Sequence, residues 1–209
     1  MGQAITVIKN TMIEWYHALI MLFMLNLMLL ACSLTIVLLP PALAALYTIT
    51  GELAYGQSLG FGDYLRAMRQ YFVKSWLWAL LNIAVFAILG SNMAFYSRMA
   101  ASWATIPYTI FLLLGLYWFI FQVYFWPYMM KQEEPSIRTA LRNTLLTSLA
   151  SPGFTLVIVA VSLLILGLSA LFVFPILLGT ATLVALLGSM AVRNRVETYT
   201  DKKQAQPEE

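Results

Sequence analysis

The sequence predicts an all-α integral membrane protein, a polytopic bundle of transmembrane helices. Of its 209 residues, 61% are hydrophobic and 10% charged, whereas soluble domains have about 45–50% and about 25%. Several uncharged runs reach the roughly 20 residues that a helix needs to cross the hydrocarbon layer. The mean hydropathy of +0.81 points the same way. These observations exclude an ordinary soluble domain.

Five uncharged runs form the predicted spans, and all lie in one transmembrane domain over residues 1–192. They are residues 18–39, 76–96, 103–128, 154–174 and 176–192. Pro40 and Pro41 end or redirect the first helix, and Pro175 suits the first turn of the fifth. Residues 193–209 form a polar, mobile cytoplasmic tail.

Residues 41–56 are the ambiguous segment. They begin apolar but reach Glu52 too soon for a comfortable crossing, which favours an interfacial or re-entrant helix. If they did cross, the chain would have six spans.

Two amphipathic helices are predicted on the membrane surface, over residues 64–75 and 136–150. Asp63 is placed to cap the first, and Pro135 and Ser136 to start the second. Both carry basic side chains among apolar ones, which suits anionic lipid headgroups or a protein partner. The candidate contacts are Arg66, Arg69, Lys74, Arg138 and Arg142.

Lysine and arginine are enriched in short cytoplasmic connections, so their distribution predicts orientation. With five spans, ten of the twelve fall on one side, and Lys9 and Arg98 fall on the other. This bias predicts the cell inner (cytoplasmic) membrane, with the N-terminus outside and the C-terminus inside.

The predicted spans contain no ionisable side chain of Asp, Glu, Lys, Arg or His, which argues against a proton-coupled carrier. The uncharged polar residues Asn26, Asn82, Asn92 and Gln122 either bond neighbouring helices or line a polar pocket. Small residues at four-residue spacing permit close approach of another helix, within the bundle or from a partner. They are Ala181, Ala185 and Ser189.

The residue inventory favours a protein that is not an enzyme and needs no cofactor. Cys32 is the only cysteine and His17 the only histidine, so a Ser-His-Asp triad or a cysteine-based zinc site cannot be assembled. The adjacent acidic residues Glu133 and Glu134 fit a solvated loop. The basic residues lie between apolar runs, which does not suggest nucleic-acid binding.

The run LeuLeuProProAlaLeuAlaAlaLeuTyr at 38–47 follows Asn26 in an apolar helix and precedes a Phe-rich basic segment at 61–75. This arrangement resembles the YesL-like family of bacterial membrane proteins. Motif matching is confined to about residues 20–80, and Pro40–Pro41 departs from the small residues common there. The family has no assigned activity, and its members tend to be encoded beside carbohydrate-uptake transporters.

The leading functional prediction is a non-enzymatic accessory or regulatory membrane protein, associated with uptake of carbohydrate or another solute. Its expected partners are anionic lipid headgroups and a membrane transporter subunit, or further copies of the chain. The alternative is a small transporter that acts as an oligomer. A membrane enzyme is a third hypothesis, and it would need a polar cavity lined by the intramembrane Asn and Gln residues.

Overall fold

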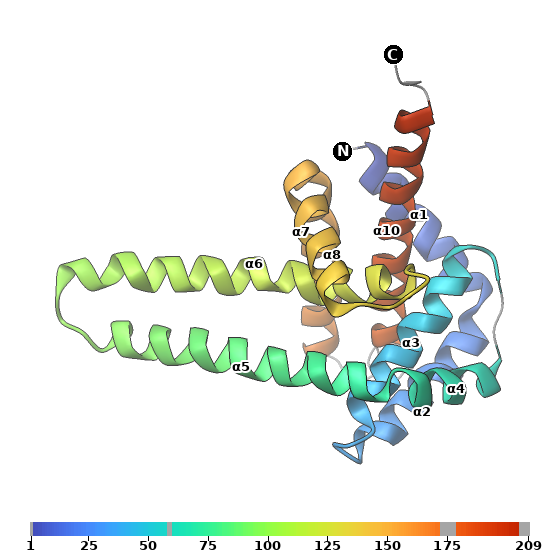
Figure 1. Cartoon of the computed structure of the whole chain (residues 1–209), viewed down its shortest axis with the longest axis horizontal. Helices are drawn as coiled ribbons and strands as arrows, with labels where there is room; N and C mark the ends of the chain where they lie inside the picture. The colour runs from blue at the N-terminus through green and yellow to red at the C-terminus, as the bar shows by residue number, and fades with distance from the viewer. Residues whose placement is uncertain (1, 58–59, 172–178, 205–209) are drawn as a thin grey trace.

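The computed structural model describes residues 2–57, 60–171 and 179–204, and all regular elements in these ranges are helices. Seven of the nine described α-helices lie wholly in a compact body, while α5 and α6 extend from it as a long hairpin (Figure 1). The predicted all-α class is confirmed.

The first predicted span, residues 18–39, begins at a sharp bend and is interrupted by turns after Ser33. α1 (Gly2–His17) and α2 (Leu19–Ser33) meet at an 86° bend, and turns follow α2 before α3 (Leu39–Ala54) begins. Pro40 and Pro41 occupy the first turn of α3, where a missing backbone N–H is tolerated. The prediction of one helix over 18–39 is therefore wrong, because the chain leaves the helix at Ser33.

Helix α3 is the centre of the body. It packs against α2, α4, α5, α6 and α10, and small side chains on it permit this close packing. Its fully buried positions include Ala42, Ala44, Ala45, Leu46 and Ile49. The ambiguous segment 41–56 thus forms most of a core helix of the body, and its interfacial or re-entrant position in a membrane stays a prediction.

The first predicted surface helix is divided into α4 (Phe61–Gln70) and the start of α5 (Phe72–Ser97), with Tyr71 between them. Gly60, not Asp63, is the N-cap, and the Asp63 carboxylate accepts a hydrogen bond from the Gly60 backbone N–H at 3.0 Å. Asp63 therefore stabilises the helix start from inside the first turn. The hydroxyl of the fully buried Tyr64 donates to the Ala42 carbonyl at 3.0 Å and ties α4 to α3.

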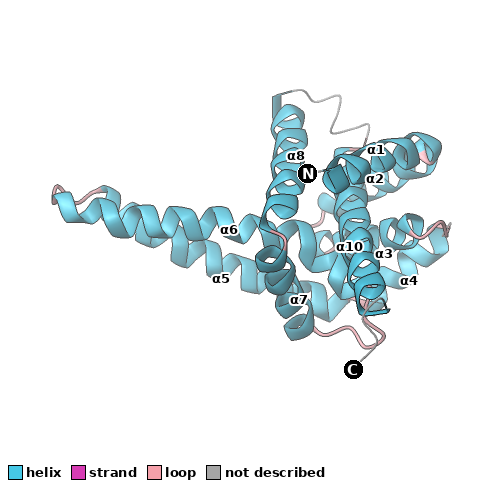
Figure 2. Cartoon of the chain, turned by 90° about the horizontal axis from the view of Figure 1, so that it is seen from above, coloured by secondary structure: helices cyan, strands magenta, loops and turns pink. Residues whose placement is uncertain are grey.

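The hairpin consists of α5, the short 3-10 helix η1 (Ser102–Ala104) and α6 (Thr105–Met130). Its projecting part has no other described helix beside it in either view (Figures 1 and 2). The tip is bound by aromatic contacts, with Tyr96 stacked on Phe111 at 6.0 Å and edge-on to Trp103 at 6.3 Å. The predicted pair of spans over 76–96 and 103–128 corresponds to this hairpin.

The remaining described helices are α7 (Ile137–Ala150), α8 (Pro152–Leu171) and α10 (Thr180–Gln204). Pro175, the end of the predicted span 154–174 and the start of 176–192 lie outside the described residues. Residues 193–204, which the sequence assigned to a polar tail, continue α10 as a helix. The Arg193 guanidinium pairs with the Glu197 carboxylate at 2.7 Å, one turn apart, which supports this extension.

Three described helices are long and apolar enough to cross a membrane, namely α5, the η1–α6 segment and α8. The bent pair α1–α2 would make a fourth if it acts as one span. The described residues therefore contain three to four candidate spans, fewer than the five predicted, and the last predicted span lies partly outside them.

Helices α1 and α10 lie side by side and run in opposite directions. Gln3, at the start of α1, accepts a hydrogen bond of 2.5 Å from Arg195, near the end of α10. Trp15, near the end of α1, lies beside Gly179, where α10 begins. Both chain ends consequently lie at the same end of the body (Figure 1). The side of a membrane that each end faces, predicted as outside for the N-terminus and inside for the C-terminus, stays a prediction.

Candidate functional site

An aromatic pocket lies where the hairpin joins the body. Its volume is about 470 Å³, and residues from α3, α5, α6, α8 and α10 line it. We call this cavity the aromatic pocket; its wall includes Tyr47, Trp78, Phe86, Phe119, Trp126 and Ser162. The volume is in the range of cavities that hold small molecules.

A stack of aromatic rings lies beside this pocket and includes Trp78 of its wall. The Trp78 ring of α5 is stacked on Phe125 of α6, with centroids 3.6 Å apart, and on Trp118 at 5.8 Å. Trp118 is in turn stacked on Phe121 at 4.9 Å. Trp78 and Phe125 are buried. This stack fixes the two hairpin helices against each other, and Trp78 is its member in the pocket lining.

Amides from two of the predicted intramembrane positions meet at the pocket. The Asn82 side-chain oxygen accepts hydrogen bonds from Trp118 Nε1 at 2.9 Å and from Gln122 Nε2 at 2.5 Å. The Asn82 amide nitrogen donates to the Trp78 carbonyl at 2.9 Å. Asn82 and Gln122 both line the pocket. They supply its polar end as well as a bond between α5 and α6.

The other two predicted amides lie elsewhere. Asn26 is buried in α2, and half-buried Asn92 donates to the Ile88 carbonyl of its own helix at 2.8 Å. Neither lines the aromatic pocket. The structure thus brings two of the four residues together and separates the others.

The small-residue stripe of α10 faces several neighbours. Ala181 lines the aromatic pocket, Ala185 is buried, and the Ser189 hydroxyl lies 3.5 Å from that of Thr50 in α3. The closest approach occurs at Gly188, which the sequence analysis did not select. A Cβ there would lie 2.6 Å from the Val123 carbonyl oxygen in α6.

The predicted basic contacts are at the surface. Arg66 and Arg69 on α4, and Arg138 and Arg142 on α7, are exposed, while Lys74 is half-buried near the start of α5. Arg66 pairs with Asp63 at 3.2 Å. Exposed guanidinium groups of this kind can reach lipid phosphates or an acidic partner.

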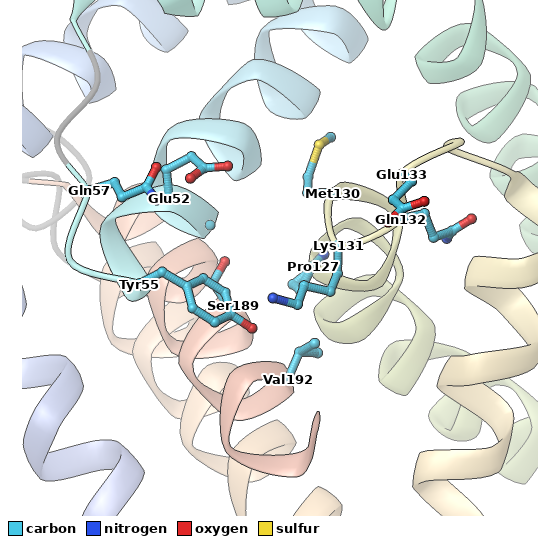
Figure 3. Close-up of a pocket in the computed structure, with 11 residues that line it drawn as sticks. Glu52, Tyr55, Gln57, Pro127, Met130, Lys131, Gln132, Glu133, Ser189 and Val192 are labelled. Carbon is cyan, nitrogen blue, oxygen red and sulfur yellow. The ribbon is translucent and has the colours of Figure 1, made fainter. Parts of the chain in front are cut away.

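A second, polar pocket of about 370 Å³ lies between the end of α3, the end of α6 and α10 (Figure 3). Charged residues line it, including Glu52, Lys131 and Glu133. The Lys131 ammonium lies 3.8 Å from the Tyr55 ring centroid. Sequence reasoning missed this pocket because its residues come from three distant segments and share no spacing pattern.

The chemistry of these pockets is that of binding sites. The aromatic pocket offers rings and amides, and the polar pocket offers hydroxyl, ammonium and carboxylate groups. Within the ranges that the structure describes, no group of three His, Cys, Asp or Glu residues could hold a metal ion.

One comparison with known proteins gave a match, over the segment from the first turn of α2 to the outer part of α5. Residues 22–93 match the DUF624 family. This segment is similar to that family, which is described as "Protein of unknown function, DUF624". No curated protein and no solved structure matches the chain.

The DUF624 segment supplies only part of each pocket. It contributes Tyr47, Trp78 and Asn82 to the aromatic pocket, and Glu52 and Tyr55 to the polar pocket. α6 and α10 complete both cavities from outside the matched segment. The DUF624 match also overlaps residues 20–80, which carry the resemblance to YesL-like proteins.

Proposed function

We propose that this protein is a non-enzymatic accessory or regulatory subunit of the bacterial inner membrane, and that it associates with a transporter for carbohydrate or another solute. The exposed apolar hairpin carries this proposal. The transport context comes from the resemblance to the YesL-like family alone. The DUF624 match indicates a family of unknown function and adds nothing about transport.

The hairpin has the dimensions of a membrane-spanning arm. α5 and α6 each contain 26 residues, which is about 39 Å of helix against a hydrocarbon layer of about 30 Å. Tyr96, Trp103 and Arg98 lie at the tip, and Lys74 and Lys131 lie near the other end. Aromatic and basic residues at both ends are typical of a helix pair anchored at two membrane interfaces.

The apolar faces of this arm are available to a partner. Only 11% of the most apolar window of either helix is buried by the chain itself. Large exposed side chains include Ile83, Phe86, Ile88, Ile110, Leu113 and Leu116. Lipid or helices of another membrane protein must cover this surface. Two directly paired helices do not enclose a path, which favours the accessory role over transport by one chain.

The non-enzymatic part of the proposal depends on the residue types at the pockets. The only histidine, His17, ends α1, and Glu133 and Glu134 are exposed. A nucleophile with an adjacent base is the usual requirement for covalent catalysis.

We place the end of the molecule that carries both chain termini in the cytoplasm, because Arg193 and Arg195 lie beside the first turns of α1 there.

A small transporter that acts as an oligomer is the second candidate, and the aromatic pocket favours it. Rings and amides together can bind a small polar solute that has one flat apolar face. Further copies of the chain packed on the hairpins could complete a path that one copy lacks.

The experiment compares two glycine variants. Gly90 on α5 and Gly167 on α8 are both exposed, and a Cβ at either would meet nothing within 4 Å in this chain. Leucine at either position is therefore compatible with the fold, but at Gly90 it obstructs a helix docked on the arm. The wild-type chain and both variants are extracted from native membranes in mild detergent, and co-purified transmembrane proteins are identified by mass spectrometry.

A membrane-spanning transporter subunit should accompany the wild type and Gly167→Leu. Its yield should fall about tenfold with Gly90→Leu, which corresponds to about 1.4 kcal/mol, within the usual cost of overpacking. Solute flux in liposomes that contain only this chain would overturn the accessory role in favour of the transporter. Equal yields with both variants would show that the hairpin is not the contact.

A further inference from the structure

The polar pocket holds opposite charges that face one cavity from separate walls. Its walls come from α3 with the residues after it, from the end of α6, and from α10 (Figure 3). We call the side with Tyr55 and Lys131 the cationic wall and the side with Glu52 the acidic wall, and no ion pair among the described residues joins Lys131 to Glu52.

The cationic wall is organised by Tyr55. The Lys131 ammonium lies 3.8 Å from the centroid of the Tyr55 ring, and the Arg193 guanidinium carbon lies 5.3 Å from it. Such contacts hold a cation by the quadrupole of the ring and leave its charge uncancelled. Arg193 also donates to the Ala54 carbonyl at the end of α3 and pairs with Glu197. Of these two cations, Lys131 is therefore the one without an anionic partner among the described residues.

The acidic wall carries Glu52 on α3, and the second carboxylate of the lining, Glu133 after α6, lies at the opposite side of the cavity in Figure 3. Neither carboxylate belongs to an ion pair of the described residues, although Lys131 lines the same cavity. In Figure 3 the side chains of Lys131, Tyr55 and Ser189 gather at one side of the cavity, and Glu52 lies at another. The buried Ser189 adds a hydroxyl at the cationic side.

A cavity with separated, unpaired charges is complementary to a ligand whose own charges are separated. From this arrangement we propose that the polar pocket binds a small zwitterion, with its anionic oxygens at Lys131 and its ammonium at Glu52. Glu133 lies at the rim and adds to the attraction for the ammonium. A ligand with one charge would satisfy one wall only and leave the other carboxylate or ammonium unpaired.

This chemistry has two possible sources, a phosphatidylethanolamine headgroup and a free compound such as an amino acid. Both carry a primary ammonium and an anionic oxygen group a few bonds apart. The volume of about 370 Å³ accommodates either. The pocket lies at the end of α6 that carries Lys131, beside the aromatic and basic end of the hairpin, where lipid headgroups lie. The site does not depend on the proposed contact of the hairpin with a transporter.

The test uses the full chain in a lipid-free neutral detergent, with soluble phosphoethanolamine and glycine as probes and isothermal calorimetry as the measurement. Ethylamine and inorganic phosphate are the probes with one kind of charge. The variants are Glu52→Gln and Lys131→Met, and their matched controls are Glu134→Gln and Arg98→Met. Glu134 is exposed and outside the pocket lining, and Arg98 is at the far end of the hairpin.

We expect at least one zwitterion to bind more tightly than ethylamine or phosphate. Each pocket variant should raise its dissociation constant about fivefold, because an exposed charge contributes up to about 1 kcal/mol, and neither control should change it. A second arm uses nanodiscs of phosphatidylcholine with or without phosphatidylethanolamine, in which native mass spectrometry counts retained lipid.

Binding of a soluble zwitterion would support the free compound, and selective retention of phosphatidylethanolamine, lost in both pocket variants, would support the lipid. Absence of both would overturn the proposal. Equal affinity for ethylamine or for phosphate would also overturn it, as would unchanged affinity in both pocket variants. Circular dichroism of each variant separates loss of the site from loss of the fold.

Discussion

Substitution of Gly188 by alanine should weaken the contact between α10 and α6. A Cβ at Gly188 would lie 2.6 Å from the Val123 carbonyl oxygen and 3.4 Å from Cγ of Pro127. Real Cβ atoms are almost never closer than 3.0 Å to such an atom. The obstacle is backbone, which cannot rotate away, so α10 must move back by about 0.4 Å or more.

The same contact explains a proline inside a long helix. Pro127 has no backbone N–H, so the Val123 carbonyl lacks its usual partner four residues later. Gly188 brings the α10 backbone against that carbonyl, where a weak Cα–H···O contact is possible. Pro127 and Gly188 are therefore one packing feature, and a side chain at position 188 would disrupt it.

The magnitude is a balance of two effects. Overpacking costs about 1–3 kcal/mol, and alanine gains about 1 kcal/mol over glycine in a helix interior. The expected net loss is therefore up to about 2 kcal/mol. Gly167→Ala is the matched control, since a Cβ there meets nothing within 4 Å, and it should be neutral or stabilising.

The assay is equilibrium unfolding in mixed micelles with increasing SDS, followed by tryptophan fluorescence. A Gly188→Ala variant as stable as Gly167→Ala would refute the close contact between α10 and α6. A loss of stability in both variants would show that the effect is not specific to that contact.

Three further predictions concern other parts of the fold. Asn82→Leu should destabilise the hairpin by about 1 kcal/mol, because it removes two hydrogen bonds between α5 and α6. The control Asn92→Leu loses only a hydrogen bond within α5 and should be close to neutral in the same SDS unfolding assay. Burial raises the pKa of the Tyr64 phenol. The contribution of this side chain to stability should therefore be complete below the unfolded-state pKa of about 10 and decline above it. Tyr64→Phe should cost about 1 kcal/mol at pH 8 and flatten the alkaline decline of stability in melting experiments. In a chain without Cys32, cysteine at Arg98 should react with an impermeant thiol reagent outside intact cells, whereas cysteine at Lys9 or Arg142 should not; labelling at Lys9 but not at Arg142 would contradict the arrangement of α1 beside α10.

The hairpin could be predicted from the sequence because local information decides it. Two uncharged runs long enough to span are joined by a brief polar connection, and basic or aromatic residues mark their ends. The bounds differ most at Tyr71, where the structure breaks the helix earlier than the charge pattern indicates. The sequence places Asp63 at the N-cap, whereas the structure places it one turn later, at the third residue of α4. A carboxylate at either position stabilises a helix start, so the sequence does not distinguish them.

The pockets could not be predicted because tertiary contacts create them. Asn82 and Gln122 were candidates for a polar cavity, but nothing in their spacing distinguishes them from Asn26 and Asn92. The pairing of α5 with α6 brings Asn82 to Gln122. Lys131 and Tyr55 likewise meet only because α3 ends beside the end of α6.

The helical end of α10 also depends on tertiary contacts. Residues 193–204 are polar enough to resemble a solvated tail, and composition alone favours that interpretation. The structure instead buries Arg195, whose guanidinium donates to Ser151 at 3.3 Å and lies 3.7 Å from the Phe154 ring centroid. Such contacts explain why the helix continues past the apolar region.

The antiparallel pairing of α1 with α10 bears on the orientation of the chain, which counting spans left open. Gln3 lies beside Arg195 and Trp15 lies beside Gly179. The start of α1 is therefore level with the second half of α10, and the end of α1 is level with the start of α10. Under the proposed placement of the body, the two chain ends therefore lie on the same side of the bilayer. In that proposal Lys9 joins the basic majority, and Arg98 at the hairpin tip is the one exception. An 11 to 1 division of the basic residues is a stronger charge bias than the 10 to 2 division of the five-span prediction.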